Sequence, residues 1–191
     1  MKILFGITGS VAAKLARKIV IKLLEAGHEI EIVATESSFY FWNENDFNGE
    51  LRAKTKIWRD KDEWVGGCYD PDIPIAHIEL AKWADAFLIA PLTANTLGKM
   101  ANGLADNLLT CVFRAWWEDG KPKPVIVAPA MNTRMWNNPV TARQIGLLKK
   151  VYGDDFHVVD PVSKKLACGE TGVGAMADID SLIAAIDGLK T

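Results

Sequence analysis

The chain has 191 residues, of which 49% are hydrophobic, and this fits a single domain over residues 1–191 with one core. Its 22 basic and 24 acidic residues give a net charge of −2 without a basic cluster, which argues against nucleic-acid or anionic-membrane binding. No apolar stretch reaches the ~18 residues of a membrane span, and the 3 cysteines are too far apart for a disulfide framework or a zinc site. We therefore expect a soluble cytoplasmic protein that binds a small molecule or another protein.

Five short apolar runs have the length of strands. We expect strands at residues 2–7, 28–35, 86–91, 125–131 and 156–161. The runs AFLIAP and VIVAPAM are apolar without interruption, which is typical of parallel strands buried on both faces. These runs predict a mainly parallel sheet.

Helical patterns separate the strands. Ser10 is the expected N-cap of a helix that Gly27 ends. Residues 93–120 carry helical apolar spacing broken near Asn102, which indicates two helices, and residues 178–189 predict a last helix with acidic residues in its first turn. The alternation predicts a doubly wound, Rossmann-like α/β fold with helices on both faces of the sheet.

Two segments show little regular pattern. Residues 43–76 are charged and turn-rich, and an irregular segment of this length in a compact domain is more often functional or interfacial than accidental. Residues 161–176 are glycine-rich and follow the last strand. They predict a mobile lid that clamps a ligand, although a loose surface connection fits the composition nearly as well.

Small polar motifs follow the expected strands, at the edge where doubly wound sheets bind ligands. GITGS, residues 6–10, begins a helix whose dipole favours a phosphate, but a serine-capped turn explains the motif equally well. GITGS lacks the GxGxxG pattern, and no acidic residue ends the second expected strand, where VATESS offers hydroxyls and amides instead. A mononucleotide is therefore favoured over a dinucleotide. Thr93, Asn95 and Thr96 offer donors and acceptors that suit a flavin ring edge, although a helix cap alone explains one of them.

Three residues are candidates for catalysis. His77 precedes a helical pattern and can exchange protons near neutral pH, although a structural histidine is the more frequent case. Asn132, with Met135 and Trp136, can bind a carboxylate beside an apolar wall, or can cap a helix next to core residues. Cys168 lies in a glycine-rich segment close to two lysines, which favours a reactive thiol.

Five motifs, in order, resemble those of one known family. GITGSVAA, HIELAKWAD, APLTANTLGKMANGLADNLLT, PAMNTRMW and KKLACGETGVGAM extend over nearly the whole chain. They are similar to motifs of the homo-oligomeric flavin-containing cysteine decarboxylases, and within that family to members that act on 4'-phosphopantothenoylcysteine in coenzyme A biosynthesis. PAMNxxMW together with the later ACGExGxGAM is specific, whereas GxxGS alone is not. The resemblance implies a lyase that uses FMN to remove the carboxylate of this substrate and yields 4'-phosphopantetheine.

The resemblance also implies residue roles. Contacts to FMN are expected at Gly9, Ser10, Val11, Thr35, Ser37, Ser38, Thr93, Ala94, Asn95, Thr96 and Ala130. Contacts to substrate are expected at Asn132, Met135, Lys165, Ala167 and Met176. His77 is then the base, Asn132 the carboxylate binder and Cys168 the proton donor, in a trimer or trimer-based homo-oligomer with the flavin between subunits.

Three alternatives share parts of this pattern. A peptidyl-cysteine decarboxylase has the same flavin machinery but needs a substrate segment that accommodates a peptide. A flavin prenyltransferase has the same fold but lacks PAMNxxMW. A non-catalytic flavoprotein that regulates a phosphatase typically carries long acidic extensions, which do not occur in these 191 residues.

Overall fold

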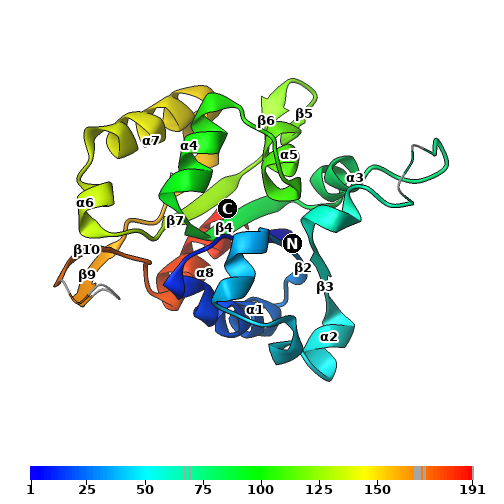
Figure 1. Cartoon of the computed structure of the whole chain (residues 1–191), viewed down its shortest axis with the longest axis horizontal. Helices are drawn as coiled ribbons and strands as arrows, with labels where there is room; N and C mark the ends of the chain where they lie inside the picture. The colour runs from blue at the N-terminus through cyan, green and yellow to red at the C-terminus, as the bar shows by residue number, and fades with distance from the viewer. Residues whose placement is uncertain (67, 69, 166–168, 170, 191) are drawn as a thin grey trace.

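The computed structural model describes all residues except 67, 69, 166–168, 170 and 191. Its centre is a six-stranded sheet with the strand order β3-β2-β1-β4-β7-β8, in which every neighbouring pair is parallel (Figure 1). The strands are β1 (Lys2–Ile7), β2 (Glu29–Ala34), β3 (Thr55–Trp58), β4 (Ala86–Leu92), β7 (Val125–Pro129) and β8 (Phe156–Val158). The predicted doubly wound sheet is confirmed, because five of these six strands overlap the expected runs.

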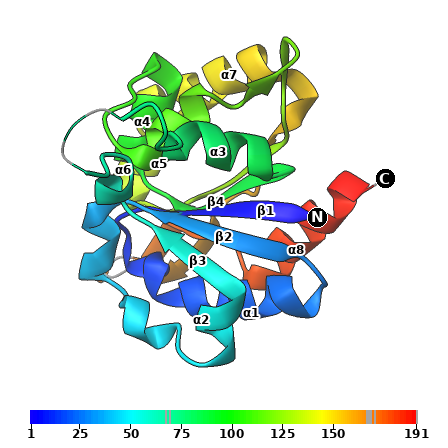
Figure 2. The ribbon, with the colours of Figure 1, turned by 90° about the vertical axis from the view of Figure 1, so that its right-hand side faces the viewer.

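Helices cover both faces of the sheet (Figure 2). One face packs against α1 (Ala16–Glu25) and α8 (Ile179–Asp187). The other packs against α3 (Ala76–Trp83), α4 (Ala94–Asn102), α5 (Leu108–Arg114) and α7 (Pro139–Tyr152). Along β1, Leu4 joins the second apolar core while Ile3 and Phe5 join the first, as the twofold side-chain period of a strand requires. Burial on both faces explains why the strands are apolar throughout.

The helix after β1 differs in detail from the expectation. Ser10 is the N-cap, and its Oγ accepts a hydrogen bond from the Ala12 N–H at 3.3 Å, but the first turn is a 3-10 helix, η1 (Val11–Leu15), before α1 begins. At the other end, Gly27 follows the helix with φ of +80°, a conformation that favours glycine. Both predicted boundary residues are therefore confirmed.

Both segments contain secondary structure, so the expectation that residues 43–76 are irregular was wrong. The first contains η3 (Glu44–Asp46), α2 (Glu50–Lys54), β3 and η4 (Asp60–Asp62). β3 is an edge strand of four residues, too short for its alternating pattern to stand out among charged neighbours. The second contains an antiparallel hairpin, β9 (Val162–Lys165) and β10 (Thr171–Ala175). Glycine has a low strand propensity, so the glycine-rich sequence of β10 did not indicate a strand.

Shorter elements complete the chain. They are η2 (Glu36–Tyr40), β5 (Trp117–Glu118), β6 (Lys121–Pro122), α6 (Thr133–Trp136), η5 (Gly153–Asp155) and η6 (Gly188–Lys190). Within the described residues, no helix has both the length and the apolar character needed to cross a membrane.

The order of the strands places a ligand site. From β1 the chain continues outward through β2 to β3, whereas from β4 it continues the other way through β7 to β8. The connections after β1 and β4 therefore diverge to opposite faces, toward α1 and α4. In doubly wound sheets this divergence opens a crevice at the carboxyl ends of the two strands.

Candidate functional site

A cavity of about 580 Å³ lies at this point of divergence. It is lined by segments that follow β1, β2, β4 and β7, and by the end of the β9–β10 hairpin. The lining residues are Gly9, Ser10, Val11, Ala12, Ser37, Phe41, Thr93, Ala94, Asn95, Ala130, Met131, Asn132, Met135, Gly174 and Met176. Its volume falls within the range of small-molecule and cofactor sites.

Eight of the eleven residues expected to contact FMN line this cavity: Gly9, Ser10, Val11, Ser37, Thr93, Ala94, Asn95 and Ala130. Thr35, Ser38 and Thr96 do not line it; all three are buried, and their hydroxyls have protein partners. Ser38 Oγ donates to the Thr35 carbonyl at 2.7 Å and accepts from Trp42 Nε1 at 3.0 Å. Thr96 is buried and its Oγ1 lies 3.2 Å from Thr93 Oγ1. A direct role for these three in cofactor contact remains a prediction.

Thr8, which no sequence pattern singled out, connects the ends of the two diverging strands. Thr8 is fully buried, and its Oγ1 donates to the Pro91 carbonyl at 2.7 Å. The same oxygen accepts from the Thr93 N–H at 3.0 Å. Thr8 thereby fixes the start of the Thr93 turn against the end of β1. A small polar residue in GITGS was the only available signal, and it did not distinguish this role from an exposed turn residue.

Gly9 is required by close packing across the cavity wall. A Cβ atom at Gly9 would lie 2.6 Å from Ser37 Oγ and 2.9 Å from Ser37 Cβ, which is closer than real Cβ atoms approach. The absence of a side chain lets the turns after β1 and β2 meet. Backbone at the Gly9 turn is thus open to a ligand from the cavity side.

The lining suits a flavin mononucleotide. Phe41, Met131 and Met176 give an apolar surface of the kind a planar ring system needs. Hydroxyl and amide groups of Ser10, Ser37, Thr93 and Asn95 give donors and acceptors. Both η1 and α4 begin at the cavity, so their N-terminal dipoles favour a single anionic group. Among the described residues, no group of three or more His, Cys, Asp or Glu side chains could hold a metal ion.

Asn132 and Met135 lie on the wall of the cavity formed by α6. Asn132 is the N-cap of α6, and its Oδ1 accepts from the Arg134 N–H at 2.8 Å. The capping interpretation is therefore correct for Oδ1, whereas the donors of the amide group are on Nδ2. Met135 also faces the cavity and is 47% exposed, so it is not a core residue. A carboxylate at this wall would meet an amide and a thioether and no full positive charge from either residue.

The β9–β10 hairpin packs against the same wall (Figure 1). The Met131 N–H donates to the Gly174 carbonyl at 2.9 Å. Gly174 has φ of +145°, and a Cβ atom there would collide with the Met131 carbonyl oxygen. Met176, just after the hairpin, lines the cavity. The end of the hairpin thus lies beside the cavity, and a role of residues 161–176 as a clamp stays a prediction.

Three of the five expected substrate contacts line the cavity, namely Asn132, Met135 and Met176. Lys165 is exposed at the end of β9 and is not part of the lining. Ala167 and Cys168 lie outside the described residues, so the expected roles of Ala167 in substrate contact and of Cys168 as proton donor stay predictions.

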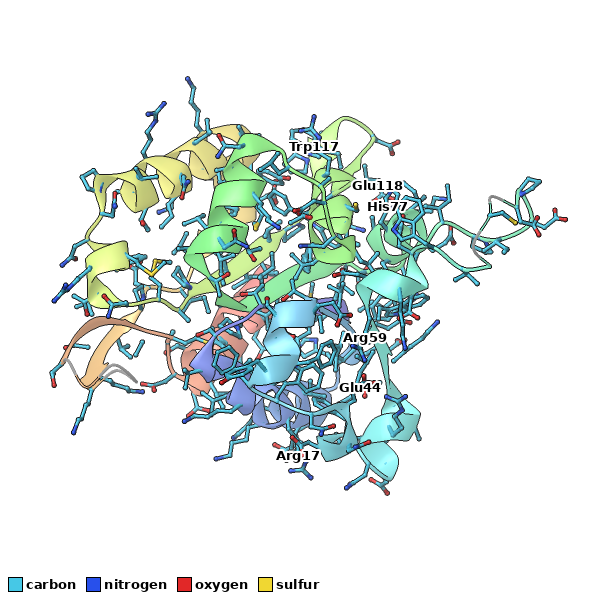
Figure 3. The ribbon with its side chains drawn as sticks, in the orientation of Figure 1. Arg17, Glu44, Arg59, His77, Trp117 and Glu118 are labelled. Atoms are coloured by element: carbon cyan, nitrogen blue, oxygen red, sulfur yellow. The ribbon has the colours of Figure 1, made fainter. Side chains whose placement is uncertain are left out.

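His77 is not part of the cavity of its own chain. It is the second residue of α3, on the other side of the molecule from α6 (Figures 1 and 3). Its Nδ1 lies 2.5 Å from Oε1 of Glu63, a carboxylate whose side chain is 5% exposed. The expectation of a backbone-bonded structural histidine does not describe this ring, because Nδ1 contacts the buried carboxylate of Glu63. Nothing in the sequence pattern around Glu63 singled it out.

Comparisons with known proteins identify relatives of this chain. The family profile described as "Flavoprotein" matches residues 1–191. A phosphopantothenoylcysteine decarboxylase from Mus musculus is 44% identical over 186 residues, which is 97% of this chain and 85% of that protein. A putative phosphopantothenoylcysteine decarboxylase from Dictyostelium discoideum is also 44% identical, over 95% of this chain and 89% of its own length.

Solved structures are similar over almost the whole chain. A PPC decarboxylase, as a cysteine-to-serine mutant complexed with pantothenoylaminoethenethiol, has a TM-score of 0.87 at 40% identity and covers 98% of this chain and 97% of its own. The FMN binding protein AtHal3 has a TM-score of 0.83 at 41% identity, covering 98% and 95%. The match of the family profile to the full length, together with these identities, shows that the chain belongs to the flavoprotein family.

Proposed function

We propose that this chain is an FMN-dependent decarboxylase that converts 4'-phosphopantothenoylcysteine to 4'-phosphopantetheine in coenzyme A biosynthesis. The observation that carries the proposal is the 44% identity to a phosphopantothenoylcysteine decarboxylase over 97% of the chain. The cavity adds support, because residues of four of the five motifs, those after β1, β4 and β7 and the late glycine-rich one, meet there. Neighbouring structures named as FMN-binding or FMN-dependent support the choice of cofactor.

Different residues around the cavity have different roles in the proposed reaction. The turns at Gly9, Ser37 and Thr93 would hold FMN, which, when bound, would act as a reversible two-electron acceptor for the carbon that bears the thiol. Asn132 donates to the substrate carboxylate without binding it as tightly as a cation would. Met135 shields the carboxylate from water, which favours its loss as neutral carbon dioxide. Cys168 returns a proton to the decarboxylated product.

His77 acts on this reaction from a neighbouring subunit. It does not line its own cavity, so a base at this position is useful only if another copy presents it. We infer a homo-oligomer, a trimer or an assembly of trimers, in which His77 of one copy faces the cavity of the next. Cys68 and Cys111 are both free thiols, which supports a reducing, cytoplasmic location.

A mixing experiment tests the shared site. His77→Asn and Asn132→Asp subunits should each be inactive alone, because each lacks one half of the site. When equal amounts are unfolded and refolded together, about one quarter of the sites should receive an intact His77 and an intact Asn132, since each is drawn independently with a probability of about one half. No recovery of activity would show that His77 and Asn132 do not act across subunits.

The activity itself is tested on the purified protein. It should be yellow, and mass spectrometry of the released cofactor should show FMN and not FAD. Incubation with 4'-phosphopantothenoylcysteine should release carbon dioxide and form 4'-phosphopantetheine. Turnover of a peptide with a C-terminal cysteine instead would favour a peptidyl-cysteine decarboxylase, and flavin binding without any turnover would favour a regulatory flavoprotein.

A further inference from the structure

Glu63 and His77 form an ionisable pair outside the cavity. Glu63 uses both carboxylate oxygens on one residue: Oε1 lies 2.5 Å from His77 Nδ1, and Oε2 accepts from the His77 backbone N–H at 3.1 Å. The Glu63 side chain is 5% exposed and the His77 side chain 26% exposed. Burying a carboxylate lowers the stability of the fold unless the carboxylate is paired, and both oxygens of Glu63 have a partner on His77.

Glu63 is held in place by the turn that precedes it. η4 follows the end of β3, and the Arg59 N–H donates to Asp62 Oδ2 at 2.7 Å. Asp60 Oδ1 accepts from the Leu108 N–H at 3.0 Å, which ties this turn to the start of α5. The Glu63 N–H donates to the Asp60 carbonyl at 3.3 Å. Glu63 is therefore presented to His77 by an anchored backbone.

The same carboxylate completes the start of α3. Ile75, the N-cap residue of α3, offers no side-chain hydrogen bond to the helix. Glu63 Oε2 takes one of the N–H groups that this helix start leaves without an intrahelical partner, and its negative charge suits the helix dipole. Helix capping explains the contact of Oε2, but it does not explain the contact of Oε1 with the His77 ring.

We propose that Glu63 is the positioning residue for His77, fixing its neutral ring as the tautomer protonated on Nδ1 so that Nε2 faces the substrate as a base. A carboxylate can only accept a hydrogen bond, so the Nδ1 atom beside it must carry the proton. Nε2 then takes the proton of the substrate thiol, while the bonding electron pair stays on sulfur as a thiolate. The negative charge of Glu63 stabilises the imidazolium that forms. The inference rests on the proposed function, in which His77 is the base.

The first test is spectroscopic and needs no substrate. In the FMN-loaded protein labelled with ¹⁵N-histidine, the neutral ring of His77 should show the long-range proton–nitrogen pattern of a protonated Nδ1. The signals that are absent from His77→Asn identify the ring, and His28 and His157 serve as internal references. A wild-type His77 protonated on Nε2 would overturn the proposal, whatever the activity of the protein.

Glu63→Gln separates positioning from helix capping. The amide oxygen of glutamine can still accept from the His77 backbone N–H, which keeps the cap. The NH₂ group then faces Nδ1 and donates to it, which moves the ring proton to Nε2 and removes the base. We expect the tautomer pattern to change, kcat to fall by about 10- to 1,000-fold and KM to stay nearly constant. The melting temperature should change little.

Glu79→Gln is the matched control. Glu79 also lies in the first turn of α3, but its carboxylate is exposed and paired with Lys82 at 3.2 Å. This variant should keep the parental kcat and the parental tautomer of His77. If Glu63→Gln also keeps both, Glu63 is only a helix cap and the proposal fails. If the wild-type protein releases no carbon dioxide, the proposed function fails, whereas the tautomer of His77 still decides the pairing.

Discussion

Replacing Thr8 with valine should loosen the point where β1 and β4 diverge. Valine has nearly the shape of threonine, so it fills the same buried space, but it has no hydroxyl. The Pro91 carbonyl would lose the donor at 2.7 Å, and the Thr93 N–H would lose the acceptor at 3.0 Å. The Pro91 carbonyl is buried, so water is poorly placed to replace its donor, whereas Thr93 lies on the cavity lining and is only partly buried.

The expected loss of stability follows from these two groups. A buried polar group left without a partner costs about 1–3 kcal/mol. Since Thr93 is only partly buried, we expect Thr8→Val to lower the free energy of unfolding by about 2–4 kcal/mol in total. Thr8→Ser keeps both hydrogen bonds and removes one methyl group, so it should cost only about 1 kcal/mol.

Urea unfolding of the FMN-free proteins measures both free energies, and quenching of FMN fluorescence measures cofactor affinity. Thr8→Val should bind FMN more weakly, because Thr93 and Ala94 lose their fixed position on the lining. Thr8→Ser should bind FMN nearly as well as the parent. If the valine variant is as stable as the serine variant, the hydroxyl does not hold the two strands together and the reasoning fails.

Other changes test separate parts of the molecule. Gly9→Ala should abolish or strongly weaken FMN binding, and Ser37→Gly should partly restore it by removing the side chain 2.6 Å from the new Cβ; fluorescence titration without this restoration contradicts the packing argument. Asn132→Asp should lower kcat far more than stability, because it sets a negative charge against the substrate carboxylate, so parental turnover removes Asn132 from that role. Cys168→Ser should release about one equivalent of carbon dioxide per site and accumulate a product two mass units lighter than normal under anaerobic conditions, as the proposed two-electron chemistry requires; normal product at the parental rate excludes Cys168 as the donor. Burial raises the pKa of Tyr152 to about 12 from 10.0, so stability should fall as the pH rises between these values, and Tyr152→Phe should flatten that loss in thermal melts; an unchanged loss points to another group.

The parallel sheet was predictable because its signal is local. A strand buried on both faces must be apolar throughout, and AFLIAP shows this within six residues. The position of the cavity followed from the same pattern, since small polar motifs after successive parallel strands have to meet at one edge. Turns such as GITGS and TANT could therefore be assigned to a ligand site before their geometry was known.

The direction of individual side chains was not predictable. Ser37 and Ser38 are adjacent, yet Ser37 lines the cavity while Ser38 is buried against Trp42. The two side chains point in different directions because they lie in the 3-10 helix η2, whose geometry could not be predicted from the residue types alone. Hydroxyl residues at a strand end predict a polar wall, but not which hydroxyl faces the ligand.

Glu63 could not be identified from the sequence, because its partner His77 is 14 residues away along the chain. An acid in a charged segment is normally solvated, and only the anchoring of η4 to α5 turns this one inward. His77 shows the complementary difficulty. The motif resemblance assigned it a chemical role, but the role needs a cavity that its own chain does not bring to it.

The positions of both halves of the site explain how copies of the chain can share it. Glu63 follows the carboxyl end of β3, and His77 is the second residue of α3, the helix that leads back to β4, so the pair lies at the same edge of the sheet as the cavity after β1 and β4. Figure 2 shows α3, which lies between β3 and β4 in chain order, running beside the sheet. A contact between His77 of one copy and the cavity of the next joins two different surfaces and is therefore heterologous. Such contacts leave an unused half-site at each end of an open chain, and only a closed ring gives every cavity a histidine. The pairing of the part-exposed His77 ring with the buried Glu63 carboxylate suits this arrangement, because a base presented to another subunit needs its orientation fixed from within its own.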